Sequence, residues 1–258
     1  MGFVKTAAEI AAIERVLKTP RFTPARRVHL QFRTTPEFVA AVMPPGLEAE
    51  GDPVVAVTIG RFGSNCCGDF DGATVSIPAR HGDVLANYVL TMFMSTDHAI
   101  VFGRDLFGEP KKQAAMSLEV AGDRIHGRVE RLGVTLIDLS IELGGDVGPA
   151  LTHSATFNIK ALPSADGIGL EDDAILTLAE FDNELTVNRG GSGRLALAGT
   201  VHDPLHEIPV LEVVAAGYVE GDFSARCRAI DRIPAAEFLP YAYGRLDDWS
   251  ALDTSGAA

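Results

Sequence analysis

The sequence predicts a single domain of the α+β class that is mostly β, with a curled or barrel-like, large antiparallel sheet and peripheral helices. Three observations predict this class. Most of the chain is a series of short segments in which apolar residues alternate with polar ones, separated by turn signals. Helical spacing of apolar residues is limited to the chain ends and to brief interruptions of this series. No internal repeat, linker or change in composition divides the 258 residues.

The first predicted element is a helix over residues 6–18, where apolar residues recur at helical spacing. Thr6 is suited to the N-cap, and Glu9 stands three positions later, as in a capping box. The prolines that follow cannot continue a helix. Residues 1–24 are therefore expected to form a helical arm.

A strand over residues 28–33 comes next, and a short helix follows it. This helix begins at Thr35-Pro36-Glu37 and ends before Pro44-Pro45. The rest of the chain is mostly strands. The predicted strands are residues 54–61, 73–79, 88–94, 114–120, 124–131, 134–143, 155–161, 175–181, 184–188, 194–198 and 210–219. Turn signals at Asp182-Asn183 and Gly190-Gly191 separate three of them.

Two more helices complete the prediction. Residues 95–107 read as a helix that interrupts the strands, and residues 234–243 read as a last helix with proline at an early position. Residues 248–258 are expected to be a disordered tail. The whole chain, 1–258, is thus expected to be one domain.

Charge and composition limit the partners of the chain. It has 22 Lys and Arg against 35 Asp and Glu, a formal net charge of -13, so nucleic acid is not an expected partner. No apolar run approaches the roughly 20 residues that cross a bilayer, so no membrane is expected either. The three cysteines are too few for a disulfide scaffold and are expected to be reduced, which predicts a cytoplasmic location.

A pair of lysines is the strongest candidate for chemistry. Only five lysines occur, and Lys111 and Lys112 stand side by side in GRDLFGEPKKQA. Gly108 is suited to the end of a helix, and Pro110 keeps Glu109 out of helical geometry. The two lysines are therefore expected on a constrained turn that leads into a strand.

A lysine amine attacks a carbonyl only when it is neutral, and both removal from water and a nearby positive charge favour the neutral form. A second lysine can supply that charge, as in the known example of acetoacetate decarboxylase. Neighbouring residues on a strand point to opposite faces, however, so Lys111 and Lys112 need not be close in space. The alternative is that the two lysines are an ordinary solvated charge pair.

GRDLFGEPKKQA resembles the active-site segment of the acetoacetate decarboxylase superfamily, in which Gly-Arg-Glu precedes a Pro-Lys-Lys turn. The stretch from Phe32-Arg33-Thr34 to Glu48, the segments 70–78 and 82–94, and the late segment 193–210 also resemble that family. The resemblance implies a cone-like β-barrel with outer helices, in a homo-oligomer. It implies Lys111 as the Schiff-base residue, Lys112 as its electrostatic partner, and an ion pair between Arg104 and Asp105 beneath the site. No metal or organic cofactor is implied.

Three polar groups of the family are missing or displaced in this sequence. Two family glutamates fall at Gly72 and Val57, and a family arginine falls near Ala25. Asp71, Arg61, Glu109, Arg26 and Arg27 are possible substitutes, and the sequence does not choose among them. The substrate-binding residues predicted on this basis are Arg27, Arg61, Phe70, Asp71, Phe107 and Glu109, beside the catalytic pair Lys111 and Lys112.

The lysine pair of the family is retained, but three of its polar groups are missing or displaced. Together these features predict a divergent lyase for a small keto acid. An aldolase or dehydratase that acts on pyruvate or another 2-oxo acid is favoured. Decarboxylation of acetoacetate, a β-keto acid, is the alternative, because both reactions use the same enamine. A second alternative is a protein that binds a keto acid without turning it over.

Two other motifs are interpreted as structural. His202 and His206 have the spacing of a zinc-binding helix, but Pro204 lies between them, so a loop is expected. The glycines of residues 190–193 lack the lysine of a phosphate-binding loop and are expected to form a hairpin turn.

Overall fold

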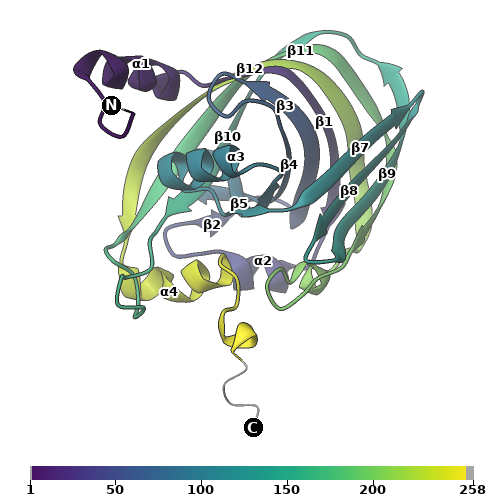
Figure 1. Ribbon diagram of the computed structural model, residues 1–258. Helices are drawn as coiled ribbons and strands as arrows, with labels where there is room; N and C mark the ends of the chain where they lie inside the picture. Colours follow the sequence, from purple (N-terminus) through teal and green to yellow (C-terminus); the bar gives the residue numbers. More distant parts are fainter. Residues whose placement is uncertain (1, 254–258) are drawn as a thin grey trace.

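The computed structural model describes residues 2–253 and shows a mostly β fold, which confirms the predicted class (Figure 1). Seven strands close a barrel. Their order is β10-β5-β4-β3-β1-β12-β11, and pairing of β10 with β11 completes the ring. The barrel strands are β1 (Arg21–Arg33), β3 (Val54–Ser64), β4 (Phe70–His81), β5 (Val84–Met94), β10 (Ala150–Lys160), β11 (Ala174–Leu197) and β12 (Glu212–Ile233).

Two very short strands attach to this ring. Strand β2 (Glu48–Ala49) pairs antiparallel with β4, and β6 (Lys111–Gln113) pairs parallel with β5. The second pairing brings the lysine segment against the barrel wall.

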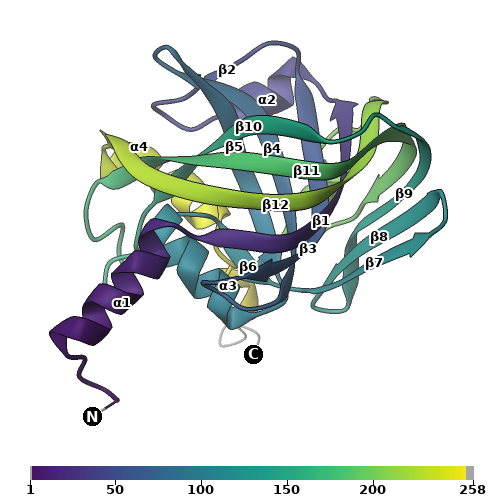
Figure 2. The same ribbon diagram turned by 90° about the horizontal axis from the view of Figure 1, so that it is seen from above.

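A second layer covers one outer face of the barrel (Figure 2). It consists of β7 (Ala115–Ala121), β8 (Arg124–Arg131) and β9 (Val134–Asp146), which continue the sheet from β11. Val28, Val57 and Leu139 are fully buried in the core between this layer and the barrel. Because side chains alternate along a strand, the neighbours of Val28 and Val57 face the barrel lumen instead. The family glutamate that falls at Val57 would therefore lie in this core and not in the lumen.

Both N-terminal helices form where their caps predict. Helix α1 (Ala7–Lys18) begins with the capping box of Thr6 and Glu9, and α2 (Pro36–Val42) begins after the N-cap Thr35. Helix α1 projects from the barrel rim (Figure 1). The arm is shorter than the predicted 1–24, because β1 already begins at Arg21.

The long strands β11 and β12 differ from the prediction. The predicted turns at Asp182-Asn183 and Gly190-Gly191 lie inside β11, so three predicted strands are one. This strand changes partner along its length, from β10 to β9, and glycine allows the close approach that the change requires. A side chain at Gly191 would collide with the carbonyl oxygen of Glu142. Strand β12 was predicted to end at residue 219, but it likewise continues to Ile233.

The remaining helices frame the barrel ends. The predicted helix 95–107 is α3 (Asp97–Phe102) followed by a π-helical turn, Gly103–Phe107, and the last helix is α4 (Ala235–Gly244). Short 3-10 helices form at Leu205–Glu207, in the predicted histidine loop, and at Ser250–Leu252. The predicted tail 248–258 is thus ordered as far as that helix, and residues 254–258 lie outside the described part. No helix of residues 2–253 is long and apolar enough to span a bilayer.

Candidate active site

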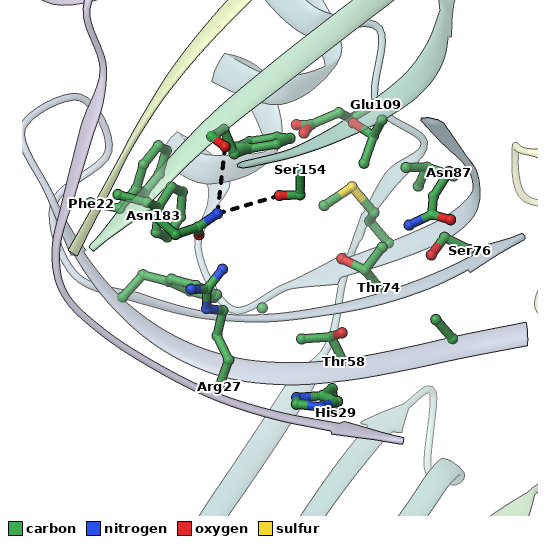
Figure 3. Close-up of a pocket in the computed structure, with 18 of the residues that line it drawn as sticks. Phe22, Arg27, His29, Thr58, Thr74, Ser76, Asn87, Glu109, Ser154 and Asn183 are labelled. Atoms are coloured by element: carbon green, nitrogen blue, oxygen red, sulfur yellow. Dashed lines mark hydrogen bonds between the residues drawn. The ribbon is translucent and has the colours of Figure 1, made fainter. Parts of the chain in front are cut away.

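The barrel holds a cavity of about 400 Å³, and Lys111 and Glu109 lie in its wall. Figure 3 shows the cavity with Glu109 at its edge. Alternate side chains of seven strands, together with Phe102 of α3 and Phe107 of the π-helical turn, line it. This volume falls in the range of about 300–1,000 Å³ that is typical of small-molecule sites. The cavity is therefore the candidate active site.

Lys111 is buried at the inner side of β6, with 6% of its surface exposed. Its Nζ lies 2.7 Å from Oε2 of Glu109 and donates a hydrogen bond of 3.2 Å to the carbonyl oxygen of Ala99. The missing side chain of Gly103 makes room for it, since a Cβ there would lie 2.5 Å from Nζ. Amine and carboxylate thus face each other in a space that excludes bulk water.

The turn that carries Lys111 is held from several directions. Gly108 has φ +76°, and a Cβ there would lie 2.5 Å from the backbone nitrogen of Lys160. Thr177 donates a hydrogen bond of 2.5 Å to the carbonyl of Phe107, and Arg245 donates one of 2.6 Å to that of Gly108. The predicted constrained turn is therefore present, and a rigid support of this kind fixes the position of a reactive group.

Lys112 points to the other face of the strand and lines a separate cavity of about 250 Å³. Its Nζ forms ion pairs with Asp203 at 3.0 Å and Asp247 at 3.2 Å, and it donates a hydrogen bond of 2.5 Å to the carbonyl of His202. Two carboxylates therefore balance its charge. This arrangement differs from the predicted electrostatic partnership with Lys111, because alternation along β6 separates the two side chains.

Arg104 also differs from its predicted role. Instead of pairing with Asp105, its Nη1 donates a hydrogen bond of 3.2 Å to the carbonyl of Lys111. Both Arg104 and Asp105 line a third, smaller cavity of about 50 Å³. Arg104 therefore supports the backbone of the lysine turn.

Arg27 extends from β1 into the cavity, and no carboxylate of residues 2–253 forms an ion pair with it. Its Cζ lies 5.0 Å above the ring of Phe223, and its buried Nε has no hydrogen-bond partner. Burial lowers the pKa of this guanidinium to about 10. The side chain passes over Gly60, where a Cβ would lie 3.0 Å from Cγ of Arg27. An unpaired buried cation of this kind is suited to bind an anion.

The register across the barrel shows what surrounds Gly72, where a family glutamate is missing. Arg27 pairs with Gly60, Gly60 with Gly72, and Gly72 with Met94, so these residues form one row on the lumen side. A Cβ at Gly72 would lie 3.1 Å from Sδ of Met94 and 3.3 Å from the ring of Phe62. Apolar side chains thus fill the place in front of Gly72, and a glutamate there would need them to move.

The structure divides the other predicted binding residues into two groups. Phe70 and Phe107 line the cavity. Arg61 and Asp71 lie outside it, where they form an ion pair of 2.8 Å, and 61% of the Arg61 side chain is exposed. Arg26 also points away from the lumen, toward Glu220 at 3.5 Å. Among the proposed substitutes, only Glu109 and Arg27 therefore reach the cavity.

Sequence reasoning missed a row of neutral polar side chains in the cavity. His29, Thr58, Thr74, Ser76 and Asn87 line the wall formed by β1, β3, β4 and β5, and this set is called the polar wall below. Burial, together with the nearby charge of Arg27, lowers the pKa of His29. Alternation along the strands could have identified these residues. Val57 and Ala73 belong to the apolar face, so Thr58 and Thr74, which follow them, must face the lumen.

The cysteines and histidines do not form a metal site. Cys66 and Cys67 are free, with sulfur atoms 3.6 Å apart, and Cys227 is also free. His202 accepts a hydrogen bond at Nδ1 from the backbone of Asp248, as befits a structural loop. Within residues 2–253, no group of three or more His, Cys, Asp or Glu is placed to hold a metal ion.

Comparisons with known proteins agree with this architecture. The chain matches the family model described as acetoacetate decarboxylase (ADC) over residues 10–232. An acetoacetate decarboxylase of Burkholderia vietnamiensis (strain G4 / LMG 22486) is 28% identical over 210 residues, which cover 79% of this chain and 85% of the relative.

Solved structures show the same fold at lower identity. Acetoacetate decarboxylase from Legionella pneumophila superposes with a TM-score of 0.74 at 20% identity, covering 83% of this chain and 87% of that one. The enduracididine biosynthesis enzyme MppR, complexed with the condensation product of pyruvate and imidazole 4-carboxaldehyde, superposes with a TM-score of 0.70 at 17% identity. That match covers 82% of this chain and 88% of MppR.

Proposed function

Because this chain belongs to the acetoacetate decarboxylase family, we propose that it is a lyase that forms a Schiff base between Lys111 and a small keto acid. The observation that carries this proposal is the Lys111 amine, buried in the cavity wall 2.7 Å from Glu109. A buried lysine with an acid–base partner within reach is a recurring arrangement for imine chemistry.

The first step needs a neutral amine, and Glu109 supplies a place for its proton. Once the proton moves to the Glu109 carboxylate, the Lys111 nitrogen attacks the ketone carbon. Loss of water then gives an iminium ion. Glu109 is close enough to return a proton to the departing oxygen, so one residue serves both directions. No metal is needed, since the iminium nitrogen itself accepts electrons.

Arg27 is proposed to bind the carboxylate of the keto acid. Within the described residues 2–253 it has no ion-pair partner, and the aromatic rings around it limit the access of water, which strengthens a charge-assisted hydrogen bond. The ring contacts between Phe22, Phe70 and Phe223 form part of this apolar surround. In a 2-oxo acid, Arg27 would hold the carboxylate while Lys111 reacts with the ketone carbon next to it.

From the iminium, the favoured course is aldol chemistry on pyruvate or another 2-oxo acid. Loss of a proton from the neighbouring carbon gives an enamine, which attacks an aldehyde, and water then leaves. The large cavity favours this course, because it leaves room for a second reactant. In MppR, the same fold binds the condensation product of pyruvate and imidazole 4-carboxaldehyde.

Decarboxylation of a β-keto acid such as acetoacetate is the second candidate. The carbon–carbon bond to the carboxylate breaks, carbon dioxide leaves, and its electron pair forms the enamine. The specific support is the 28% identical relative named acetoacetate decarboxylase. A keto-acid binder without turnover would stop at the imine.

Borohydride trapping tests the shared step. The protein is incubated with pyruvate or acetoacetate and borohydride, and the modified peptide is identified by mass spectrometry. We expect an adduct on Lys111 that is lost in Lys111→Ala and kept in Lys18→Ala, a control in the exposed part of α1. No adduct with any keto acid would overturn the proposal.

Product analysis then separates the candidates. Aldehyde consumption with pyruvate identifies the aldolase, and carbon dioxide release from acetoacetate identifies the decarboxylase. An adduct with neither product identifies a binder.

A further inference from the structure

The polar wall of the cavity has no role in the imine chemistry proposed above. His29 pairs in register with Thr58, and Thr58 pairs with Thr74, so these side chains lie side by side on three adjacent strands. Ser76 and Asn87 continue the wall toward β5. Figure 3 shows Thr58, Thr74 and Ser76 pointing into the cavity.

The wall side chains are open to a ligand. Within residues 2–253, none of the side-chain hydrogen bonds involves the five members of the wall, although Ser76 is only 7% exposed. Ser76 is buried, and His29, Thr58, Thr74 and Asn87 are half-buried, so water or a ligand can reach the polar atoms of the wall and pair with them. Hydroxyl, amide and imidazole groups can each donate or accept, which suits a ligand with several hydroxyl groups.

The wall begins within one substrate length of the reactive amine. Met92 pairs with both Lys111 and Thr74, so Thr74 is two strands away from Lys111, and Thr58 is three. At about 4.8 Å per strand, these separations are about 10 and 14 Å along the sheet. The lysine side chain spans part of this distance. A chain of several carbon atoms, attached at the ketone, covers the rest.

We propose that the polar wall binds the hydroxylated chain of a 4-hydroxy-2-oxo acid whose ketone reacts with Lys111. This inference rests on the proposed function and names its substrate class. In the cleavage direction, the proton leaves the C4 hydroxyl and the C3–C4 bond breaks. Its electron pair moves through C3 to the iminium nitrogen, giving an enamine and an aldehyde. Protonation at C3 and hydrolysis then release pyruvate, and the reverse sequence is the aldol addition.

Two other tails fit the wall less well. An apolar chain would leave several wall groups without partners, which is costly in a buried site. A phosphorylated chain would need cations, but the wall has none, and the lowered pKa of His29 keeps that ring neutral at pH 7. A neutral chain with hydroxyl groups can pair with the wall side chains and needs no cation.

A matched pair of acids tests the inference. The probes are 4,5,6-trihydroxy-2-oxohexanoate and 2-oxohexanoate, which share the reactive head and the chain length. Initial rates of borohydride trapping on Lys111 are compared at equal concentrations of open-chain ketone, with pyruvate as the reference. We expect trapping of the hydroxylated acid to be at least tenfold faster at subsaturating concentration.

Two variants assign the preference to the wall. In Thr58→Val/Thr74→Val, where two hydroxyls are replaced by methyl groups, the preference should fall by about tenfold. Thr91→Val is the control, because Thr91 lies on β5 but faces the separate cavity of Lys112. It should keep the preference of the unmodified protein.

The outcomes distinguish this inference from the proposed function. If pyruvate is trapped but the two hexanoates react equally, the polar-wall inference fails and the Schiff-base proposal stands. The same holds if the double variant keeps the full preference. If no keto acid is trapped, both fail.

Discussion

Arg27 is a single residue that brings an unbalanced positive charge into the cavity. Burial lowers its pKa, with no carboxylate to offset that effect, and its guanidinium lies over the ring of Phe223. Even at about 10, the pKa leaves the guanidinium charged at pH 7. Pairing of this guanidinium with a substrate carboxylate therefore lowers the free energy of the complex.

Replacing Arg27 with methionine tests this role. Arg27→Met should raise the KM for pyruvate about 10- to 100-fold, because a hydrogen bond to a charged group is worth about 1.5–3 kcal/mol. Trapping of acetone, which has no carboxylate, should change far less. Arg26→Met is the matched control, since Arg26 faces Glu220 outside the lumen. If the reactions of pyruvate and acetone with Lys111 weaken equally, Arg27 does not bind the carboxylate and its role is structural.

At this scale, the sequence predicted the constrained turn that carries Lys111, but not the surroundings of its side chain. Local turn chemistry at Gly108 and Pro110 identified the constrained segment, and alternation warned that Lys111 and Lys112 need not meet. The choice of Glu109 depends on where the turn aims this carboxylate, whereas Asp71 lies on β4 and pairs with Arg61 outside the cavity. That direction is set by contacts with Thr177 and Arg245, which are distant in sequence.

The π-helical turn, Gly103–Phe107, is the element that shapes the reactive end of the cavity. Such turns occur mostly as single insertions and often at functional sites. Here the turn places Gly103 beneath the amine of Lys111, and its last residue, Phe107, lines the cavity. The position of the amine therefore depends on the absence of a side chain.

Gly103→Ala should disable the site without removing a reactive group. The new methyl group would overlap Oε2 of Glu109 and would lie 2.5 Å from the Lys111 Nζ, so the pair must separate. We expect borohydride trapping to slow at least 100-fold, while the circular dichroism spectrum stays that of the parent. Gly145→Ala is the control, because a Cβ there meets nothing within 4 Å. Trapping at the parental rate would show that Lys111 and Glu109 can shift to accept the methyl group, which would contradict this prediction.

Elements were predictable where their signals are local. The caps Thr6 and Thr35 marked both N-terminal helices correctly, and β8 was predicted over its observed bounds. The strand β11 was not, because a bent strand that changes partner uses the same glycines as a turn. Only the tertiary pairing with β9 and β10 distinguishes the two.

For the whole molecule, a buried charge network connects distant parts of the chain. Lys112 of β6, Arg131 of β8, Asp203 of the histidine loop and Asp247 after α4 contact one another, and their formal charges cancel. Lys112 also donates to the carbonyl of Leu246. The network thus fastens the C-terminal segment to the barrel.

Asp247→Asn tests this contribution through its pH dependence. Burial alone would raise the pKa of Asp247, but the hydrogen bond from Arg131 and the charge of Lys112 outweigh it, so the pKa lies below 3.8. The ionised carboxylate therefore stabilises the fold above about pH 4, and this contribution is lost as the pH falls through the lowered pKa.

Urea unfolding from pH 7 to pH 3 is the measurement. At pH 7 the variant should lose about 1 kcal/mol of free energy of unfolding, a modest value because the carboxylate is partly exposed. The deficit should shrink toward pH 3. Glu14→Gln, on the exposed face of α1, should show no such trend. A deficit that is constant with pH would point to packing and not to charge.

The overall architecture was predictable as a class, because alternating strands with few helices allow little else. Closure of the ring was not, since it depends on the pairing of β10 with both β5 and β11. No local pattern specifies partners so far apart in sequence.

The crowded space in front of Gly72 has a consequence for protein engineering. A glutamate introduced at this position alone would press against Met94 and Phe62, so both side chains would have to shift to admit it. Restoring the family carboxylate therefore calls for smaller residues at positions 94 and 62 together with the glutamate, whose own volume would then fill the space they vacate.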